Sequence, residues 1–429
     1  MPRSAKIKGK ESHKGTKALR NDTSWFFTLS LRVFVAGLIL LMAVLVLIPG
    51  EAFCGSPYSA VGLGFLMPDD TGISRSIGGA GVAVGEGVNM IRGNPALIGT
   101  FTSSSYSIAT IYDRIQTYTG GSDRPIYGKY NLSLMKFVLP VWRGVIISWG
   151  LSPYSRTDVK IRVNSKPDDI FRDEMTSSGG INVSTFSLAA SIRQRVYFGA
   201  GLNYYFGAIE ENWKRTFPDN TDMNGTTDNL KKKYKGYSGT VGILFKPVQR
   251  TYVGIGYTSE ADLDLDAVLQ TGNTIDTEVL ASSRGLKLPG ALRFGVSSYI
   301  SKRLMAACDY SMEQWESAAR TPKEKAMYTD TWKIGGGLRF IPSTRINAPL
   351  LMKLPLSVGF RAGKLYYKSY PEIDAVTEKA VTFGVEIPVS RGVGRLYNTF
   401  ELGFRGDKGS NGWEETFFSY SLSLVGVFK

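Results

Sequence analysis

The sequence predicts an all-β protein: a transmembrane antiparallel β-barrel of about 14 strands, with an N-terminal hatch, or plug, inside the lumen. Three observations favour this fold. Segments of about ten residues alternate between large apolar and small or polar side chains, and the connections between them alternate between long and short. A glycine-rich segment precedes the first of these strands. Because successive side chains of a strand point to opposite faces, a period of two indicates extended chain.

The first element, residues 1–54, is predicted to be an export signal with a long basic leading region. Residues 1–32 carry eight Lys and Arg against two acidic residues, and an uncharged apolar run of 16 residues follows from Val33 to Ile48. That run is shorter than the roughly 20 residues that span a bilayer, and small residues near Ala52 suit cleavage. The alternatives are a permanent N-terminal anchor or a lipid on Cys54, although Phe53 is not the small residue that lipoprotein processing needs.

The second element, residues 55–99, is predicted to be the hatch. Between Ile77 and Gly99 seven of 23 residues are glycine, and an Asn94-Pro95-Ala96 turn lies near the end. Glycine permits tight folding and close backbone approach, and Pro95 disfavours a helical Asn94. A barrel of about 14 strands encloses a lumen that wall side chains alone cannot fill. The segment is therefore predicted to pack inside the barrel; the alternative is a flexible periplasmic tail.

The third element, residues 100–429, is predicted to be the barrel. Seven long connections alternate with six short ones, as in bacterial outer-membrane barrels with short periplasmic turns and longer outer loops. Hydrocarbon offers no partner to backbone N–H and C=O groups, so a sheet in lipid has to close on itself. The predicted strands centre near Ile108, Leu132, Ile147, Leu188, Leu202, Val241, Ile255, Phe294, Ala306, Ile334, Val358, Phe383, Phe400 and Leu422.

The two faces of these strands differ in chemistry. In Trp332–Phe340 one face carries large apolar residues and the other carries Lys333, Arg339 and two glycines. The apolar faces are predicted to contact lipid and the charged faces to line a polar lumen; a soluble β-sandwich is the alternative. The residues predicted to face the lumen include Arg293, Lys333, Arg339, Arg361, Glu386, Glu401 and Arg405.

Catalysis is not predicted. The only histidine, His13, lies in the predicted signal, so the mature chain cannot build a Ser-His-Asp triad, a Cys-His pair or a His-ligated metal site. The chain also lacks a Gly-Lys-Ser/Thr phosphate-binding loop. No cofactor, metal or nucleic-acid partner is expected. The excess of 51 Lys and Arg over 37 Asp and Glu indicates contact with a membrane surface in an exported chain.

The glycine-rich opening resembles a known family. Gly78, Gly79 and Gly81, followed by Asn94, Pro95 and Ala96, are similar to the amino-terminal hatch of the FadL/TodX family, fourteen-stranded outer-membrane channels for long-chain fatty acids and aromatic hydrocarbons. The resemblance implies passive uptake of hydrophobic molecules gated by the hatch, in the outer membrane of a Gram-negative bacterium. The same opening resembles PorV-like barrels, which implies the alternative of a scaffold or shuttle in protein secretion. The terminal Lys429 departs from the aromatic residue with which such barrels usually end.

A hydrophobic cargo needs an apolar pocket with a few polar groups to orient it. Phe65 and Leu66 of the hatch are predicted to form part of that apolar wall, and a lumenal cation to bind a carboxylate. The alternative is that these two residues only pack the plug and that each cation pairs with Glu386, Glu401 or Asp309. The candidate cations are Arg293, Lys333, Arg339 and Arg361.

The predicted short turns carry basic residues and no acidic ones. This one-signed rim indicates contact with anionic head groups of the inner leaflet or with an acidic periplasmic partner. Basic residues of the long loops are expected near lipopolysaccharide phosphates, and the protein is predicted to be a monomer. The rim residues are Arg143, Arg193, Arg195, Lys246, Arg250, Lys302, Arg303, Arg345, Lys353 and Arg391.

Overall fold

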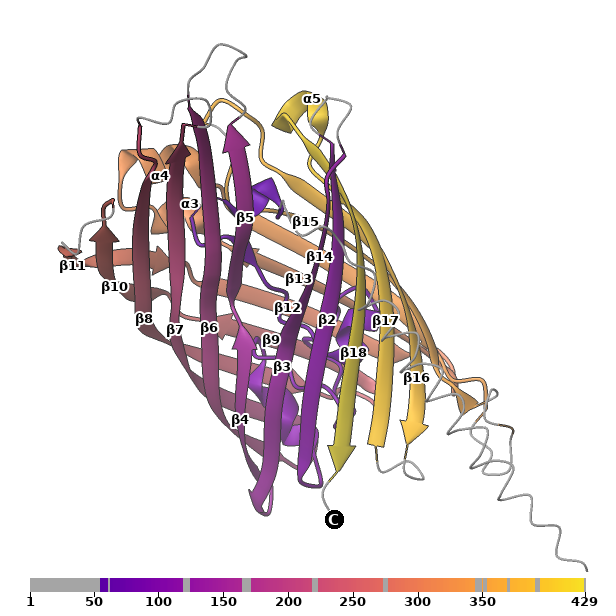
Figure 1. The fold of residues 1–429 in the computed structure, drawn as a ribbon. Helices are drawn as coiled ribbons and strands as arrows, with labels where there is room; N and C mark the ends of the chain where they lie inside the picture. The colour runs from indigo at the N-terminus through magenta and orange to yellow at the C-terminus, as the bar shows by residue number, and fades with distance from the viewer. Residues whose placement is uncertain are drawn as a thin grey trace, which may run out of the picture. The chain divides into compact units, whose positions relative to one another are not determined.

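The computed structural model describes most of the chain beyond the predicted signal (Figure 1). The described residues are 55–60, 62–118, 124–163, 171–217, 223–272, 277–343, 349, 353–368, 371–389 and 394–427. The signal predicted over residues 1–54 and the last residues, Phe428 and Lys429, lie outside this range. No helix among the described residues is long and apolar enough to cross a membrane.

The wall consists of antiparallel strands in sequence order. They are β2 (Ser105–Tyr118), β3 (Ile126–Trp142), β4 (Val145–Pro153), β5 (Ser155–Val163), β6 (Arg172–Ile192), β7 (Val196–Thr216), β8 (Thr226–Phe245), β9 (Thr251–Thr258), β10 (Ala261–Gln270), β11 (Thr277–Leu288), β12 (Ala291–Tyr299), β13 (Leu304–Glu313), β14 (Thr331–Phe340), β15 (Leu356–Lys364), β16 (Thr377–Val389), β17 (Gly394–Arg405) and β18 (Glu414–Val427).

Fourteen of these strands form a closed ring. Each pairs with both of its neighbours, and β18 closes the ring by pairing with β2 from Ser105 to Tyr118. The remaining three wall strands continue members of the ring: β5 follows β4 after Tyr154, β10 follows β9, and β11 precedes β12. The predicted fold class and strand number are confirmed, because the fourteen predicted centres fall in fourteen different strands of the ring.

The lengths predicted for three long connections were wrong. Residues 155–180, 210–233 and 260–285, expected to be loops, contain β5, β10, β11 and the outer parts of β6, β7 and β8. The alternation of apolar and polar residues stops there because both faces of the strands carry polar residues, such as Lys231 and Lys232. Backbone pairing nevertheless continues: Lys232 of β8 is paired with Ile209 of β7. Polar strands therefore extend the wall beyond its apolar band.

The helices of the wall connections all lie at one end of the barrel, which we call the long-loop end. They are α3 (Trp315–Ala318), α4 (Pro322–Met327) and α5 (Lys408–Asn411). A capping box starts α4: Thr321 accepts from the backbone N–H of Glu324, whose side chain bonds back to the backbone N–H of Thr321. The opposite, short-turn end holds the connections β3–β4, β6–β7, β8–β9, β12–β13, β14–β15 and β16–β17.

The outward and inward faces of the wall agree with the predicted chemistry. Large apolar side chains remain exposed on the outside of the ring, among them Leu202, Val241, Phe294, Val358 and Leu402. A continuous apolar band around a closed barrel suits lipid rather than water. The inward face instead buries the charged side chains of Arg339, Glu386, Glu401 and Arg405.

Candidate functional site

The described residues that precede the wall, 55–60 and 62–104, pack against its inner face; we call them the inner segment. They include η1 (Pro57–Ser59), β1 (Phe65–Leu66), α2 (Gly72–Ser76) and η2 (Pro95–Thr100). The short helix α2 contacts β15, β16, β17 and β18, whereas η2 contacts β4, β6, β7 and β8 from the other side. Contacts to opposite arcs of the ring place the inner segment inside the barrel, as Figure 1 shows.

Glycines of the wall allow the inner segment to lie directly on the wall backbone. A Cβ atom at Gly254 would lie 2.4 Å from the carbonyl oxygen of Val82, and one at Gly256 would lie 2.0 Å from that of Gly93. Across the lumen, a Cβ atom at Gly359 would lie 2.2 Å from the backbone nitrogen of Gly78. Any larger residue at these wall positions would displace the inner segment.

The predicted hatch residues hold the inner segment in shape and in place. Asn94, fully buried, caps η2: its Oδ1 accepts from the N–H of Ala96 at 3.1 Å, and its Nδ2 donates to the carbonyl of Val82 at 2.8 Å. Pro95 is the first residue of η2, where its missing N–H costs nothing. Gly78 and Gly79 follow α2 with φ of 73° and 82°, a conformation that glycine adopts without strain.

One wall carboxylate anchors the turn that follows these glycines. Asp309 of β13 accepts two backbone hydrogen bonds through Oδ2, from Gly81 at 2.5 Å and from Val82 at 2.7 Å. Within the inner segment, Asp69 accepts from the N–H groups of Arg92 at 3.0 Å and Gly93 at 2.7 Å. The glycine-rich part of the inner segment is therefore tied both to itself and to the wall.

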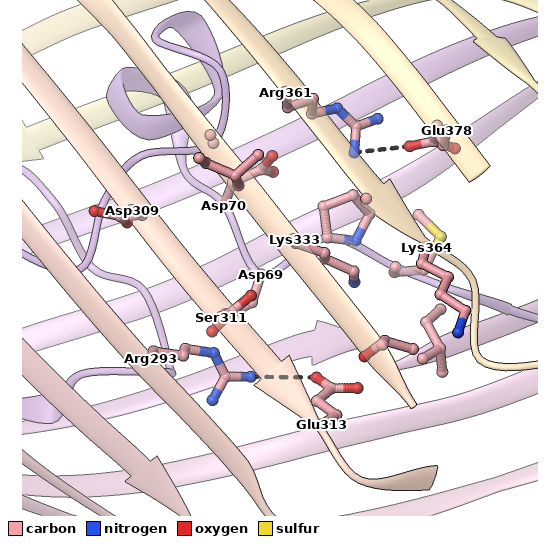
Figure 2. A pocket seen from close by; sticks show the side chains of 18 of the residues that line it. Asp69, Asp70, Arg293, Asp309, Ser311, Glu313, Lys333, Arg361, Lys364 and Glu378 are labelled. Atoms are coloured by element: carbon pink, nitrogen blue, oxygen red, sulfur yellow. Dashed lines mark ion pairs between the residues drawn. The ribbon is translucent and has the colours of Figure 1, made fainter. Parts of the chain in front are cut away.

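A cavity of about 170 Å³, which we call cavity 1, lies between the inner segment and β12–β15 (Figure 2). Phe65, Leu66, Tyr154, Tyr366 and Tyr367 supply apolar surface. Figure 2 shows side chains of Asp69 and Asp70 from the inner segment near wall residues that include Arg293, Ser311 and Lys333. The charged residues that line cavity 1 are Asp69, Asp70, Arg92, Arg293, Asp309, Glu313, Lys333, Arg361, Lys364 and Glu378.

The four predicted lumenal cations have different surroundings. Arg339 lines neither cavity described here: it pairs with Glu386 at 2.6 Å and with Glu86 of the inner segment at 3.3 Å. Arg361 lines cavity 1 but is bound to Glu378 at 2.9 Å and to Glu401.

The two remaining cations have weaker ion-pair contacts. Arg293 lies 3.8 Å from Glu313 and donates to Thr258 Oγ1 at 3.2 Å. Lys333 is exposed in the lumen and makes no ion pair with a described residue. Cavity 1 thus brings together Arg293, Lys333, Arg361, Phe65 and Leu66 of the predicted set, and Lys333 is the one best able to bind an added anionic group.

Sequence reasoning did not single out Arg405 as a site residue, although it predicted that this residue faces the lumen. Its guanidinium pairs with Glu378 at 2.6 Å and Glu415 at 2.7 Å, and it lies 4.1 Å from the ring centre of Phe65. This network continues to the inner segment, where Arg75 pairs with Asp70 at 2.9 Å. Burial raises the pKa of Asp70, and Arg75 opposes that shift. The charges hold one side of the inner segment against β16–β18.

The wall is interrupted beside this network. From Met135 onward β3 pairs with β4, but the preceding part of β3, Ile126–Leu134, has no strand partner on that edge among the described residues. The neighbouring β5, described throughout, pairs on its free edge with Phe65 and Leu66 of β1 instead. Side chains bridge the opening: Tyr127 donates to Asp158 Oδ2 at 2.6 Å, and Lys129 pairs with the same carboxylate.

A second cavity of about 80 Å³, cavity 2, lies behind this opening. It is lined by Tyr127 and Lys129 of β3, by Asp158 of β5 and by residues of β2 and β18. Cavities 1 and 2 share four lining residues, and three of them belong to the inner segment. The shared residues are Phe65, Met67, Pro68 and Arg361. A short stretch of the inner segment therefore separates the lumenal cavity from the wall opening.

Among the described residues, no group of three or more His, Cys, Asp or Glu side chains is placed to hold a metal ion.

Comparison with known proteins gives one family and a group of similar folds. A model of the BamG family matches residues 32–425. A Pseudomonas aeruginosa FadL homologue is similar in structure, with a TM-score of 0.59 and 12% identity over 85% of this chain and 100% of that chain. The CymD monoaromatic hydrocarbon channel has a TM-score of 0.56 and 15% identity, over 86% of this chain and 99% of that chain. The P. putida toluene transporter TodX has a TM-score of 0.56 and 12% identity, over 84% of this chain and 99% of that chain. A search of curated proteins found no match. At these identities the likeness establishes the fold.

Proposed function

The chain belongs to the BamG family, and we propose that it is a channel for passive uptake of hydrophobic molecules, long-chain fatty acids or aromatic hydrocarbons, across the outer membrane of a Gram-negative bacterium. The observation that carries this proposal is the interruption of the wall between β3 and β5, with cavity 2 directly behind it. An interruption of the wall with a cavity behind it supports transport rather than catalysis.

We propose that the opening leads to lipid rather than to water. On the outward face beside it, Tyr130 and Leu132 of β3 are exposed, with Leu132 at 44%, in line with the apolar band. Apolar surface is worth about 25 cal/mol per Å² when it is removed from water. An apolar molecule that leaves the lumen sideways is therefore stabilised by the bilayer, whereas one that leaves through the short-turn end has to enter water.

Cavity 1 is the proposed binding site. Phe65, Leu66 and the tyrosines of its lining provide apolar contact, and Lys333 provides a cation for a carboxylate. An anionic amphiphile fits this combination, with its head group on Lys333 and its chain against Phe65 and Leu66. Arg293 is the second proposed contact, since its link to Glu313 is long at 3.8 Å.

Gating is assigned to a part of the inner segment. Phe65, Met67 and Pro68 separate the two cavities, whereas the stretch that contains Gly81, Val82 and Asn94 is tied to the wall. We therefore propose that a shift of residues 65–68 joins cavity 1 to cavity 2 while the remainder of the hatch stays in place. The paired carboxylate Asp158 then has to release Lys129 or Tyr127 before cargo passes.

The fold neighbours support this proposal by their described roles, a monoaromatic hydrocarbon channel and a toluene transporter. We further propose export by the signal predicted over residues 1–54, a hatch over residues 55–99, a barrel over residues 100–429, contact with lipopolysaccharide at the long-loop end, and a monomeric state. A scaffold or shuttle role in protein secretion is the competing function.

Uptake by cells tests the proposal. Labelled oleate and labelled toluene are given to a deletion strain, to the complemented strain, and to a strain complemented with Lys333→Gln. We expect uptake of both compounds to fall on deletion, and oleate uptake to fall more than toluene uptake for Lys333→Gln. Equal uptake by the deletion and complemented strains, together with recovery of secretion proteins in a pulldown, would establish the scaffold role instead.

A further inference from the structure

The described turns at the short-turn end form a surface of one charge sign. None of them contains Asp or Glu, while the turns between β3 and β4, β6 and β7, β8 and β9, and β12 and β13 each carry Lys or Arg. We call the exposed cations of these four turns the basic arc. They are Arg143, Arg193, Arg195, Arg250, Lys302 and Arg303.

These cations make few contacts with the described part of the protein. None of them makes an ion pair with a described residue, and the one aromatic contact among them is that of Arg250 with Tyr299, at 5.4 Å from the ring centre. Arg193, Gln194 and Arg250 also have positive φ of 51°, 54° and 65°. Non-glycine residues in this region carry a cost of order 1 kcal/mol each. The β6–β7 and β8–β9 turns therefore keep Arg193 and Arg250 at positions where glycine would be less strained.

Exposed apolar side chains accompany the cations. Trp142 precedes Arg143 and is 79% exposed, Ile192 precedes Arg193 at 57%, and Ile300 lies two residues before Lys302 at 68%. A large apolar side chain at the end of the lipid-facing band with a cation beside it is the arrangement that membrane proteins use at the boundary between hydrocarbon and head groups.

The arc is long and narrow. Its four turns join β3, β4, β6, β7, β8, β9, β12 and β13, which are consecutive neighbours around the ring. Strands about 4.8 Å apart spread these turns over roughly 35 Å of circumference. Cations distributed along a curve at one membrane depth match a layer of lipid head groups better than the single contiguous patch that a protein partner covers.

We propose that the basic arc binds anionic phospholipid head groups in the leaflet that faces the short turns. The phosphate and net negative charge of the lipid are bound by the arc cations, while Trp142 and Ile300 enter the acyl boundary. This inference rests on the proposed membrane insertion but not on the cargo of the channel.

Lipid selectivity measured by spin-label EPR tests the inference. The full chain is reconstituted in phosphatidylcholine bilayers that contain spin-labelled phosphatidylglycerol or spin-labelled phosphatidylcholine. Each cation near a membrane surface contributes about fivefold to the binding of an anionic lipid, so we expect a severalfold preference for phosphatidylglycerol that declines in 0.5 M NaCl, a salt concentration that shortens the Debye length to about 4 Å.

Two variants with five substitutions each complete the test. The arc variant replaces Arg143, Arg193, Arg195, Lys302 and Arg303 by Gln, and the control replaces five exposed lysines of the long-loop end. The control residues are Lys214, Lys323, Lys325, Lys379 and Lys408. Heat-modifiable gel mobility confirms that each variant is folded. We expect the arc variant to lose the preference and the control to keep it.

Three outcomes would overturn the inference: no preference in the unmodified chain, the same preference in the arc variant, or an equal loss in both variants. Retained lipid preference with loss of an acidic periplasmic protein from a pulldown would identify the arc as a protein-docking surface instead. Unchanged oleate uptake by the arc variant would separate lipid binding from the proposed channel function.

Discussion

Replacing Asp309 by Leu removes the wall carboxylate that holds the turn after Gly78 and Gly79 of the inner segment. Its Oδ2 accepts hydrogen bonds from Gly81 at 2.5 Å and Val82 at 2.7 Å. A hydrogen bond contributes about 0.5–1.5 kcal/mol, and up to about 3 kcal/mol when its acceptor is charged, so the two together are worth at least about 1 kcal/mol to the docked turn. Since about 1.4 kcal/mol is a tenfold change, the ratio of docked to undocked turn is expected to fall by at least about fivefold.

Conductance in planar bilayers reads this change directly. The unmodified channel is expected to be nearly silent, and the Asp309→Leu variant to show frequent openings and to sensitise cells to a large antibiotic such as vancomycin. Asp309→Asn, which keeps one acceptor oxygen, should be intermediate. Ser311→Ala is the control, because Ser311 lines cavity 1 from the same strand. A folded Asp309→Leu barrel that is as silent as the Ser311→Ala barrel would refute the anchoring role.

Three further predictions concern the cavities and the wall glycine that contacts the inner segment. Lys333→Gln should weaken oleate binding by about tenfold or more and leave toluene binding unchanged, because a charge-assisted contact is worth about 1.5–3 kcal/mol. Fluorescence displacement measures both affinities, and an equal loss of affinity for oleate and toluene would argue against a head-group role. Asp158→Asn should raise oleate uptake no more than about fivefold, since a partly exposed ion pair contributes about 0–1 kcal/mol; slower uptake would contradict a bridging role. Gly256→Val should raise conductance or lower the folded yield, because its Cβ would lie 2.0 Å from the Gly93 carbonyl oxygen. A normal yield of folded protein with no conductance would show that the wall tolerates a side chain where it contacts the inner segment.

The sequence was sufficient to predict the barrel because lipid imposes one simple pattern on each strand. In β14, Trp332, Ile334 and Leu338 face outward and Arg339 inward, as the period of two requires. The pattern was insufficient for the outer parts of β6, β7 and β8. There both faces contact water, so polar residues such as Lys231 and Lys232 look like loop residues although they remain paired.

The site was harder to predict because its contacts join residues that are far apart in sequence. The glycines of the predicted hatch could be recognised in the sequence, but the role of wall glycines such as Gly254 and Gly359 depends on which backbone lies against them. Likewise, four lumenal cations looked equivalent in sequence. Only their partners distinguish the buried Arg339 from Lys333, which makes no ion pair with a described residue. The pairing of β5 with Phe65 and Leu66, which interrupts the wall, leaves no periodic pattern from which it could be predicted.

The exit of cargo through the opening between β3 and β5 is the central claim, and closing that opening tests it most directly. Lys129 and Asp158, whose side chains meet across the opening, are both replaced by Cys in a background with Cys308→Ser, and a short bismaleimide joins them. We expect oleate uptake to fall to the level of the deletion strain once the two cysteines are joined, while each single-cysteine control keeps uptake at or above that of the unmodified chain after the same treatment. Normal oleate uptake by a fully cross-linked barrel would contradict the account.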